Sequence, residues 1–343
     1  MKIKVWQKDL EKALSKVKGA VASNNTMPIL RGIYVNHNTV LATDMELGIK
    51  TQYQAEVEEK GATVFPNNVV EIVKQLPKGK VSIEVKNHTA KIKCDNSEFE
   101  LKCYNPDEFP QLPQVEDPKT LTLDNEKLKK AINKTKMAAS NDETRPAMKG
   151  LHFSDEFVTA TNTYRLSNYK VNIGIEELIL PVETAKEIAK IDSEEVEIEY
   201  SDNYIKFKFD SETIISRLIE GKYPNWKQIM PSDYKTKVTA NKRELKDALK
   251  RAKIVASDNN VVKVKADEKL EVIANADEGQ AHEVLDANIE GEKKKINFDV
   301  GYLLDVIKVL ENDEIELRLI DKLSPLMVVE NNLKYLVMPV REG

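Results

Sequence analysis

Apolar residues recur at helical spacing in three widely separated stretches of the chain. One of them, LKKAINKTKMAAS, spans residues 128–140, and one helical face of it gathers Leu128, Ala131, Ile132 and Thr135. The stretches LEKALSKVK from Leu10 and LKDALKRAK from Leu245 repeat its order of Leu, Ala, Leu or Ile, and two basic positions. The three starts lie 118 and 117 residues apart. The pattern predicts one amphipathic helix that occurs three times, with lysines on its polar face.

Other segments repeat in the same order after each of these helices. Alternation of apolar and polar residues predicts strands in VLATDMELGI from 40, VTATNTYRLS from 158 and VIANADEGQA from 272. A second helical window follows, in FPNNVVEIVKQLP from 65, LPVETAKEIAKI from 180 and FDVGYLLDVIKVL from 298. The next strand is KVSIEV, EVEIEY or EIELRL. The first two of the three repeats end with EFPQLPQVEDP and YPNWKQIMP, which we interpret as exit strands followed by linkers.

A period of this length indicates whole domains in tandem, because short solenoid repeats recur every 20–50 residues. The 343 residues also exceed one ordinary hydrophobic core. We therefore predict an α+β protein built from three copies of a domain with two helices and two sheets. The predicted domains span residues 1–117, 118–235 and 236–343.

Charge is distributed unevenly between these helices and the rest of the chain. The formal net charge is -5, yet the segments 7–22, 125–138 and 241–255 carry +2, +4 and +4, which leaves -15 for the remainder. A single lysine-rich face is usually only a solvated surface. Three equivalent basic faces on an acidic protein instead favour a surface for a polyanion such as DNA.

The sequence offers no recognisable catalytic machinery. It contains no glycine-rich phosphate loop, HExxH, GxSxG or CxxC motif, and its four histidines lack metal-ligand spacing. Cys94 and Cys103 are expected to be reduced thiols. The pairs Asp44 with Glu46 and Asp313 with Glu314 are conceivable metal ligands, but acidic turns are common in this chain. We predict a binding protein without cofactor, metal or catalytic residue. No apolar run reaches the length of a membrane span or a signal peptide, so we expect a cytoplasmic location.

Five motifs resemble those of the bacterial sliding clamp family, the β subunits of DNA polymerase III. They are ATDMELGI (42–49), TRPAMKG (144–150), ATNTYRLS (160–167), YPNW (223–226) and VMPVR (337–341). The resemblance implies the DNA clamp fold, which closes as a head-to-tail homodimeric ring of six similar domains. It also implies a processivity factor that encircles duplex DNA and tethers the replicative polymerase. The alternatives are a DNA-modifying enzyme with an acidic metal site and a tandem scaffold that binds only proteins.

Basic residues of the three helices are the candidate DNA contacts in the ring channel. We expect them to meet phosphates without reading bases, so that binding is independent of sequence. These residues are Lys12, Lys16, Lys127, Lys130, Lys134, Lys246, Lys250 and Arg251. Asn24 and Asn25 occupy the loop where some family members have a DNA-contacting arginine, and that role is not transferred to them.

The resemblance also implies a hydrophobic cleft that takes short linear peptides from the polymerase, the clamp loader and repair proteins. Its apolar walls would be Met148, Leu166, Pro224, Ile229, Leu323, Leu336, Met338 and Val340. Thr161, Arg165 and Arg341 would contribute polar rim contacts, and Tyr302 a movable lid. The surrounding motif positions are Thr163, Tyr164, Gln228, Pro325 and Pro339. For Leu166 and Leu336, an ordinary place in the core at a domain boundary is the alternative. Asn162 and Thr163 depart from the residues usual in the family.

Three further positions match the family's subunit interface. A three-domain chain closes half a ring, so two chains would meet through domains 1 and 3 at two identical contacts. Lys74, Ile254 and Val255 are the candidate interface residues. For Ile254 and Val255, membership of their own domain's core is an equally good interpretation.

Overall fold

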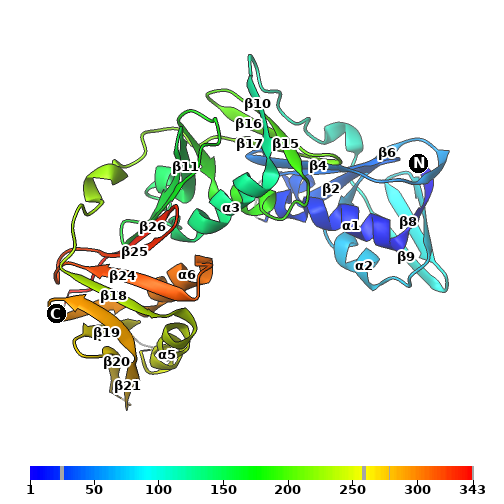
Figure 1. Cartoon of the computed structure of the whole chain (residues 1–343). Coiled ribbons are helices and arrows are strands. Elements are labelled where there is room, and N and C mark those ends of the chain that lie inside the picture. Colours follow the sequence, from blue (N-terminus) through cyan, green and yellow to red (C-terminus); the bar gives the residue numbers. More distant parts are fainter. Residues whose placement is uncertain (24–26, 257–259, 278, 342–343) are drawn as a thin grey trace. The chain divides into compact units, whose positions relative to one another are not determined.

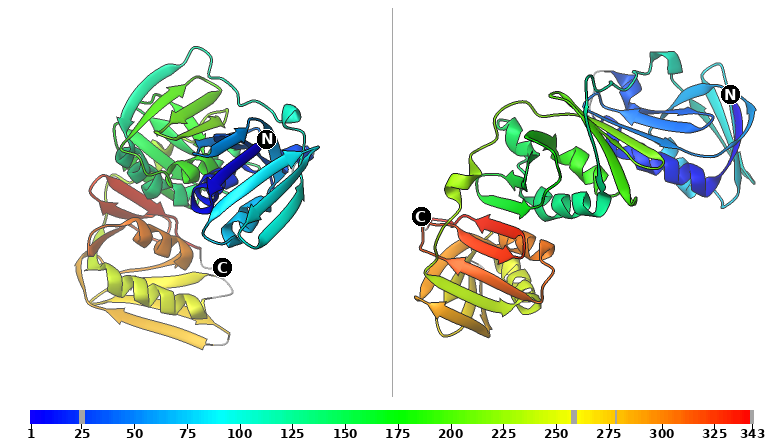
Figure 2. Two further views of the ribbon diagram at one scale, coloured as in Figure 1. Left: turned by 90° about the vertical axis from the view of Figure 1, so that its right-hand side faces the viewer. Right: turned by 45° about the horizontal axis from the view of Figure 1, so that its top comes forward.

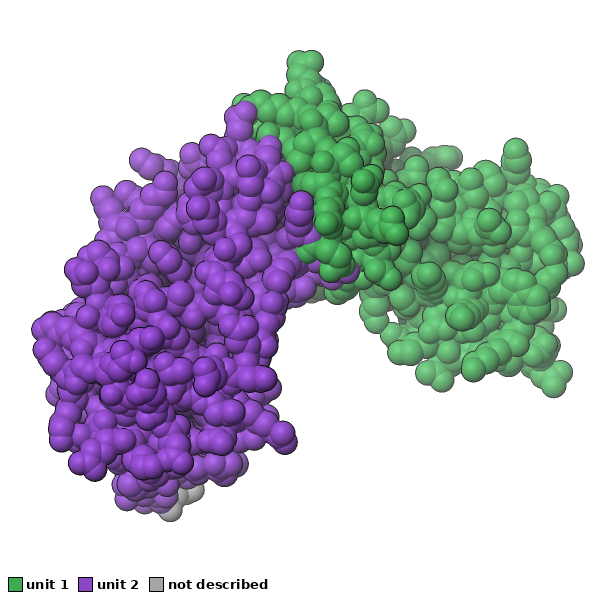
Figure 3. Space-filling model, viewed as in Figure 1, with its two compact units in different colours: residues 1–126, 190–218 green, residues 127–189, 219–343 purple. Residues whose placement is uncertain are grey.

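The computed structural model describes residues 1–23, 27–256, 260–277 and 279–341, so Asn24 and Asn25 lie outside the described residues. The chain forms two compact units (Figure 3). Unit 1 comprises residues 1–126 and 190–218, and unit 2 comprises residues 127–189 and 219–343. No helix of the described residues is both long and apolar enough to cross a membrane.

Unit 1 contains two antiparallel sheets. The first has the strand order β5-β1-β7-β8-β9 and the second β10-β15-β16-β17-β4-β3-β2-β6 (Figure 1). The strands of the first sheet are β1 (Lys2–Trp6), β5 (Glu56–Glu59), β7 (Lys80–Lys86), β8 (Thr89–Cys94) and β9 (Ser97–Lys102). Those of the second are β2 (Gly32–Asn36), β3 (Thr39–Thr43), β4 (Leu47–Gln52), β6 (Ala62–Pro66), β10 (Lys119–Asp124), β15 (Glu195–Tyr200), β16 (Tyr204–Lys208) and β17 (Glu212–Arg217). Helices α1 (Gln7–Val17) and α2 (Val69–Gln75) pack against each other, and α1 also packs on β3 and β4.

Unit 2 also contains two antiparallel sheets, but it carries more helices than unit 1. Its larger sheet has the order β14-β11-β12-β13-β26-β25-β24-β18-β22 and its smaller one β21-β20-β19-β23. The larger sheet consists of β11 (Gly150–Ser154), β12 (Phe157–Thr161), β13 (Arg165–Lys170), β14 (Leu178–Pro181), β18 (Thr236–Asn241), β22 (Ala287–Gly291), β24 (Glu314–Leu319), β25 (Leu326–Glu330) and β26 (Leu333–Val337). The smaller consists of β19 (Val261–Ala266), β20 (Leu270–Ala276), β21 (Gly279–Leu285) and β23 (Lys294–Asp299). The helices are α3 (Asn125–Thr135), which begins at the boundary with unit 1, α4 (Val182–Ile188), α5 (Lys242–Val255) and α6 (Val300–Val309), and α5 packs against α6 (Figure 2).

The six predicted helices and the predicted strands are present, whereas the predicted exit strands are wrong. Residues 109–118 form no strand, and residues 218–230 contain only a short 3-10 helix, Trp226–Ile229. Proline lacks the N–H that a strand ladder requires, and both segments are rich in it. Instead, each segment places an aromatic ring against a sheet. Phe109 lies 5.7 Å from Tyr34 in unit 1, and Tyr223 stacks on His152 at 4.7 Å in unit 2, measured between ring centroids.

The sheets run across the predicted domain boundaries, which is why the compact units do not coincide with three domains. Strand β17 pairs with β4 in unit 1, and β26 pairs with β13 in unit 2. The residue pair Ile215 with Gly48 in the first junction corresponds to Leu336 with Leu166 in the second. The domain limits at 117 and 235 stay predictions.

An identical turn precedes both junctions. The hydroxyl of Thr43 donates to the Leu47 carbonyl at 2.9 Å, and that of Thr161 donates to the Arg165 carbonyl at 2.8 Å. Asp44 and Asn162 each accept two backbone N–H groups through Oδ1. The next residues, Met45 and Thr163, have φ values of 81° and 77°. The Asp44 carboxylate therefore stabilises this turn, and it needs no role as a metal ligand.

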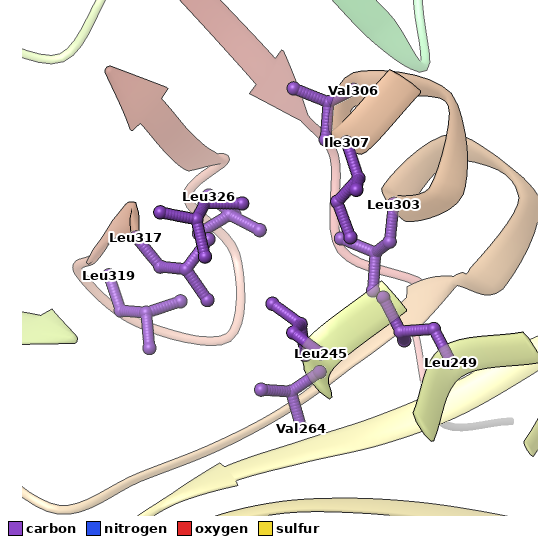
Figure 4. Close-up of a pocket in the computed structure, with 10 residues that line it drawn as sticks. Leu245, Leu249, Val264, Leu303, Val306, Ile307, Leu317, Leu319 and Leu326 are labelled. Carbon is purple, nitrogen blue, oxygen red and sulfur yellow. The ribbon is translucent and has the colours of Figure 1, made fainter. Parts of the chain in front are cut away.

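The interior of unit 2 leaves a small gap between α5, α6 and the sheets (Figure 4). Its volume is about 20 Å³, and its lining is entirely aliphatic: Leu245, Leu249, Val264, Leu303, Val306, Ile307, Ile315, Leu317, Leu319 and Leu326. A buried water needs polar partners, and this lining has none. The gap is a packing feature of the core and not a ligand site.

Candidate nucleic-acid interface and peptide cleft

The three repeated helices bury the predicted apolar faces. In α1 the buried residues include Leu10, Ala13, Leu14 and Val17, and in α5 they are Leu245, Ala248, Leu249 and Ala252. The corresponding residues of α3, Leu128, Ala131, Ile132 and Thr135, are no more than 1% exposed. Each helix directly follows a strand, so its apolar face is held against the sheets and its basic face points away from them.

The candidate DNA contacts differ in whether a carboxylate of the protein already pairs with them. Lys12, Lys127 and Lys246 form no ion pair with any residue that the structure describes. Lys250 has only a 3.8 Å contact with Asp247, one turn earlier on the same exposed helix surface. These four residues keep the character that the sequence predicts for phosphate contacts.

The basic residue six positions after the first leucine of each repeat is ion-paired. Lys16 pairs with Glu212, and Arg251 makes a two-pronged contact with Glu283, with Nε–Oε1 and Nη2–Oε2 distances of 2.9 and 2.6 Å. The third, Lys134, donates to the Val309 carbonyl and lies 3.4 Å from Glu330 and 3.1 Å from Glu311. Its side chain is only 6% exposed.

The prediction that Lys134 is an open phosphate contact is therefore wrong. Taking a lysine out of water is costly unless carboxylates and carbonyls replace the hydration, and here they do so. Lys134 ties α3 to strand β25 instead of facing a ligand. The neighbouring Lys130 also pairs with Glu311, at 3.0 Å, but remains 47% exposed.

A polar groove beside α1 was not anticipated from the sequence. It has a volume of about 220 Å³ and includes Lys12 and Lys16 in its lining. Its other polar side chains are Asp9, Thr51, Gln52, Tyr53, Gln54 and Ser211. The Thr51 and Tyr53 hydroxyls already donate to the Ser211 and Asn36 carbonyls. The amide groups of Gln52 and Gln54 beside Lys12 remain suited to a phosphate oxygen, because they can donate hydrogen bonds to it. No local motif marks these glutamines, since they meet α1 only through the fold.

The segments predicted to form the peptide cleft converge in unit 2. One buried apolar cluster, which we call the cleft floor, consists of Leu166, Ile179, Tyr223, Trp226, Met327 and Leu336. Ala147 and Met230 pack against it. Every motif segment thus contributes at least one residue to the cleft floor or to the side chains packed against it. The segments are 144–150, 161–166, 223–230, 321–327 and 336–341. Leu166 and Leu336 are 1% and 2% exposed, as the core alternative requires.

Around the cleft floor lie apolar side chains that are open to solvent. Leu323, Tyr164 and Ile229 are 72%, 63% and 50% exposed. Thr163, Gln228 and Arg341 are also exposed, and Met148, Pro224, Pro325, Met338, Pro339 and Val340 are partly buried. Thr161 is an exception, because it is 4% exposed and its hydroxyl is used within the turn. Its predicted rim contact is wrong.

Arg165 and Tyr302 form one network. The Arg165 guanidinium pairs with Asp305 and lies 4.6 Å from the centre of the Tyr302 ring. Its side chain is only 12% exposed, because the guanidinium is used in the pair with Asp305. Arg165 therefore offers little surface for the predicted polar contact at the cleft rim. The Tyr302 hydroxyl accepts a hydrogen bond from Asn162 at 3.3 Å. Tyr302 thus covers the Arg165 guanidinium, and its role as a movable lid stays a prediction.

The matching place in unit 1 is closed. The segment around Phe109 corresponds to that around Tyr223, which makes Val115 the counterpart of Ile229 and Leu30 the counterpart of Met148. Val115 is 9% exposed and Leu30 is fully buried. In place of Leu166 unit 1 has Gly48, and a Cβ there would lie 2.2 Å from Leu112, so the linker fills the space. Unit 1 does expose Met27 and Met45 in the matching segments, at 46% and 51%, but the counterparts of Met148 and Ile229 are buried there.

The candidate interface residues are mostly exposed. Ile254 is 78% exposed, which excludes the core interpretation for it, and Lys74 is also exposed. Val255 is partly buried. No group of His, Cys, Asp or Glu side chains within the described ranges is arranged to hold a metal ion.

Comparisons with known proteins agree along the whole chain. Models of the N-terminal, central and C-terminal domains of the DNA polymerase III beta subunit match residues 1–113, 122–225 and 227–341. The Beta sliding clamp of Bacillus subtilis is 32% identical, over 99% of this chain and all of that protein. The Beta sliding clamp of Staphylococcus aureus is 31% identical, over 94% of each.

Solved structures are similar over their full length. The DNA polymerase sliding clamp of Bacillus subtilis superposes with a TM-score of 0.90 at 30% identity, and each chain is covered completely. A sliding clamp from Bartonella birtlesii bound to griselimycin gives a TM-score of 0.92 at 27% identity, again with complete coverage of both chains.

Proposed function

Because the chain belongs to the beta sliding clamp family, the beta subunits of DNA polymerase III, we propose that it is a sliding clamp that encircles duplex DNA and gives the replicative polymerase processivity. The observation that carries this proposal is the threefold basic helix on an otherwise acidic chain. Such a surface attracts phosphates without reading bases. The function needs no catalytic residue, cofactor or metal, and its place is the cytoplasm. Neither an acidic metal site nor a scaffold without DNA has a supporting observation.

The cleft in unit 2 is the proposed docking site for the polymerase, the clamp loader and repair proteins. Its supporting feature is the buried cleft floor with exposed Ile229, Leu323 and Tyr164 around it. Short linear peptides bind such surfaces through a few apolar anchors. Met148 and Met338 suit several ligands, because a thioether side chain adapts its shape.

A homodimer closes the proposed ring, and the internal repeat suggests the register of its contact. Strand β9 corresponds to β17 and β26, whereas β21 corresponds to β4 and β13, and both β9 and β21 are edge strands. Phe99 on β9 is 38% exposed, yet its counterparts Ile214 and Tyr335 are buried opposite Ile49 and Ser167. The same pairing would place Phe99 against Ala281 of the partner subunit. Lys74, Ile254 and Val255 would lie beside this strand pair.

Retention on circular DNA tests the proposal. The chain, loaded by a clamp loader onto a nicked circular plasmid, should stay bound through gel filtration at high salt. A single cut in the plasmid should release it, because a ring slides off a free end. Equal retention on linear and circular DNA would mean ordinary binding, which salt abolishes by counterion release. Absence of retention on either DNA would exclude the clamp function.

A further inference from the structure

Carboxylates hold several of the basic residues that the three helices present. Glu311 is the most exposed of them, with a side chain 52% accessible, and it contacts Lys130 at 3.0 Å and Lys134 at 3.1 Å. It lies in the turn between α6 and β24. Its own N–H donates to both carboxylate oxygens of Glu330 at 2.9 Å, which fixes the turn that carries it.

The other two helices carry the same kind of contact. Glu212 of β17 pairs with Lys16 of α1, and Glu283 of β21 pairs with Arg251 of α5. In each case the acid comes from a strand or turn outside the helix. One basic residue or more on every helix is thus neutralised by a carboxylate, whereas Lys12, Lys127 and Lys246 have no such partner within the described chain.

A DNA phosphate and Glu311 would compete for the same cation. Lys130 is 47% exposed, so a phosphate can reach it, but only by replacing the carboxylate or sharing the ammonium with it. Since an exposed ion pair is weak, the competition lowers the strength of the phosphate contact without abolishing it. A clamp that slides benefits from this, because retention by a ring does not need tight contacts.

We propose that Glu311 is an electrostatic brake on DNA binding, which withholds Lys130 from the phosphates and thereby keeps the channel contact weak enough for sliding. The inference rests on the proposed clamp function and adds a regulatory residue to its DNA surface. The hydrogen bond from Lys130, with that from Lys134, lowers the pKa of the Glu311 carboxyl, so it stays ionised at neutral pH.

The test compares Glu311→Gln with a matched control. Glu58→Gln makes the same charge change in a pair with Lys2 and Lys4, which alternate with the buried Ile3 and Val5 and so face away from the helices. Binding to a short labelled duplex is followed by fluorescence anisotropy over a range of KCl concentrations. Glu311→Gln should bind several-fold more tightly at low salt, and its log–log salt slope should steepen by about 0.9, the value of one added phosphate contact. Glu58→Gln should bind like the wild type.

A double variant separates release of Lys130 from a change in overall charge. With Lys130→Gln in place, Glu311→Gln should change the slope little, because the cation it frees is gone. The proposed role of Glu311 would be contradicted if Glu311→Gln and Glu58→Gln changed the DNA affinity equally. It would also be contradicted if Glu311→Gln left the log–log salt slope unchanged. Absence of salt-dependent binding in the wild type would instead contradict the proposed function. Thermal unfolding checks that every variant is folded.

Discussion

Lys134 shows how a charged residue of a basic helix can serve the fold instead of a ligand. Its spacing of four residues from Lys130 places both on one arc of α3, and the sequence therefore groups them. Its burial depends on Glu330, a residue 196 positions away along the chain. No local pattern carries that information, whereas the apolar face of the same helix is a local property and was predicted correctly.

The substitution Lys134→Met should strongly destabilise the protein. It leaves the Glu330 carboxylate, 4% exposed, without its cation, and breaking a buried pair typically costs about 3–5 kcal/mol. Urea unfolding followed by circular dichroism measures the loss. Lys130→Met is the control, because its exposed pair is worth at most about 1 kcal/mol. Similar unfolding midpoints for the two variants would show that backbone N–H groups alone satisfy Glu330.

At the scale of elements, the strongest contrast lies between the two Pro-rich segments. The sequence predicts an exit strand for both. In the structure neither forms a strand, and both instead cover a sheet. One of them ends in the exposed Ile229 and the other in the buried Val115. Leu112 packs close to Gly48 in unit 1, whereas its counterpart Trp226 packs in one cluster with Leu166 in unit 2. The repeat thus predicts the convergence of the motifs, but which copy stays open is decided by packing.

Replacing Ile229 and Val115 by alanine should separate binding from stability. Ile229→Ala should weaken a polymerase-derived peptide about tenfold or more, since such anchors concentrate binding energy. Its unfolding midpoint should hardly change, because half of the side chain is already exposed. Val115→Ala should leave peptide affinity intact and lower the midpoint. Isothermal titration calorimetry and thermal unfolding give the two readouts, and unchanged affinity in Ile229→Ala would relocate the cleft.

At the scale of the whole molecule, the proposed dimer accounts for an aromatic side chain at a sheet edge. Phe99→Asp should place a charge where the register puts Ala281 of the partner subunit, and it should yield monomers. Light scattering should give twice the 38.9 kDa of one chain for the wild type and 38.9 kDa for the variant. Val57→Asp, at the opposite edge strand β5 and 41% exposed, serves as the control and should stay dimeric. A dimeric Phe99→Asp would refute the register.

The pairing of β17 with β4 has a consequence for proteolysis. A protease that cut within residues 109–118 would break the covalent link between the first two predicted domains, but it would not separate the pieces. Backbone hydrogen bonds along five residue pairs, from Leu47 with Ser216 to Thr51 with Glu212, would still join them. The nicked chain should therefore behave as two complementary fragments that stay assembled until they are denatured. Residues 109–118 therefore only cover a sheet, whereas the pairing of β17 with β4 holds the first two predicted domains together.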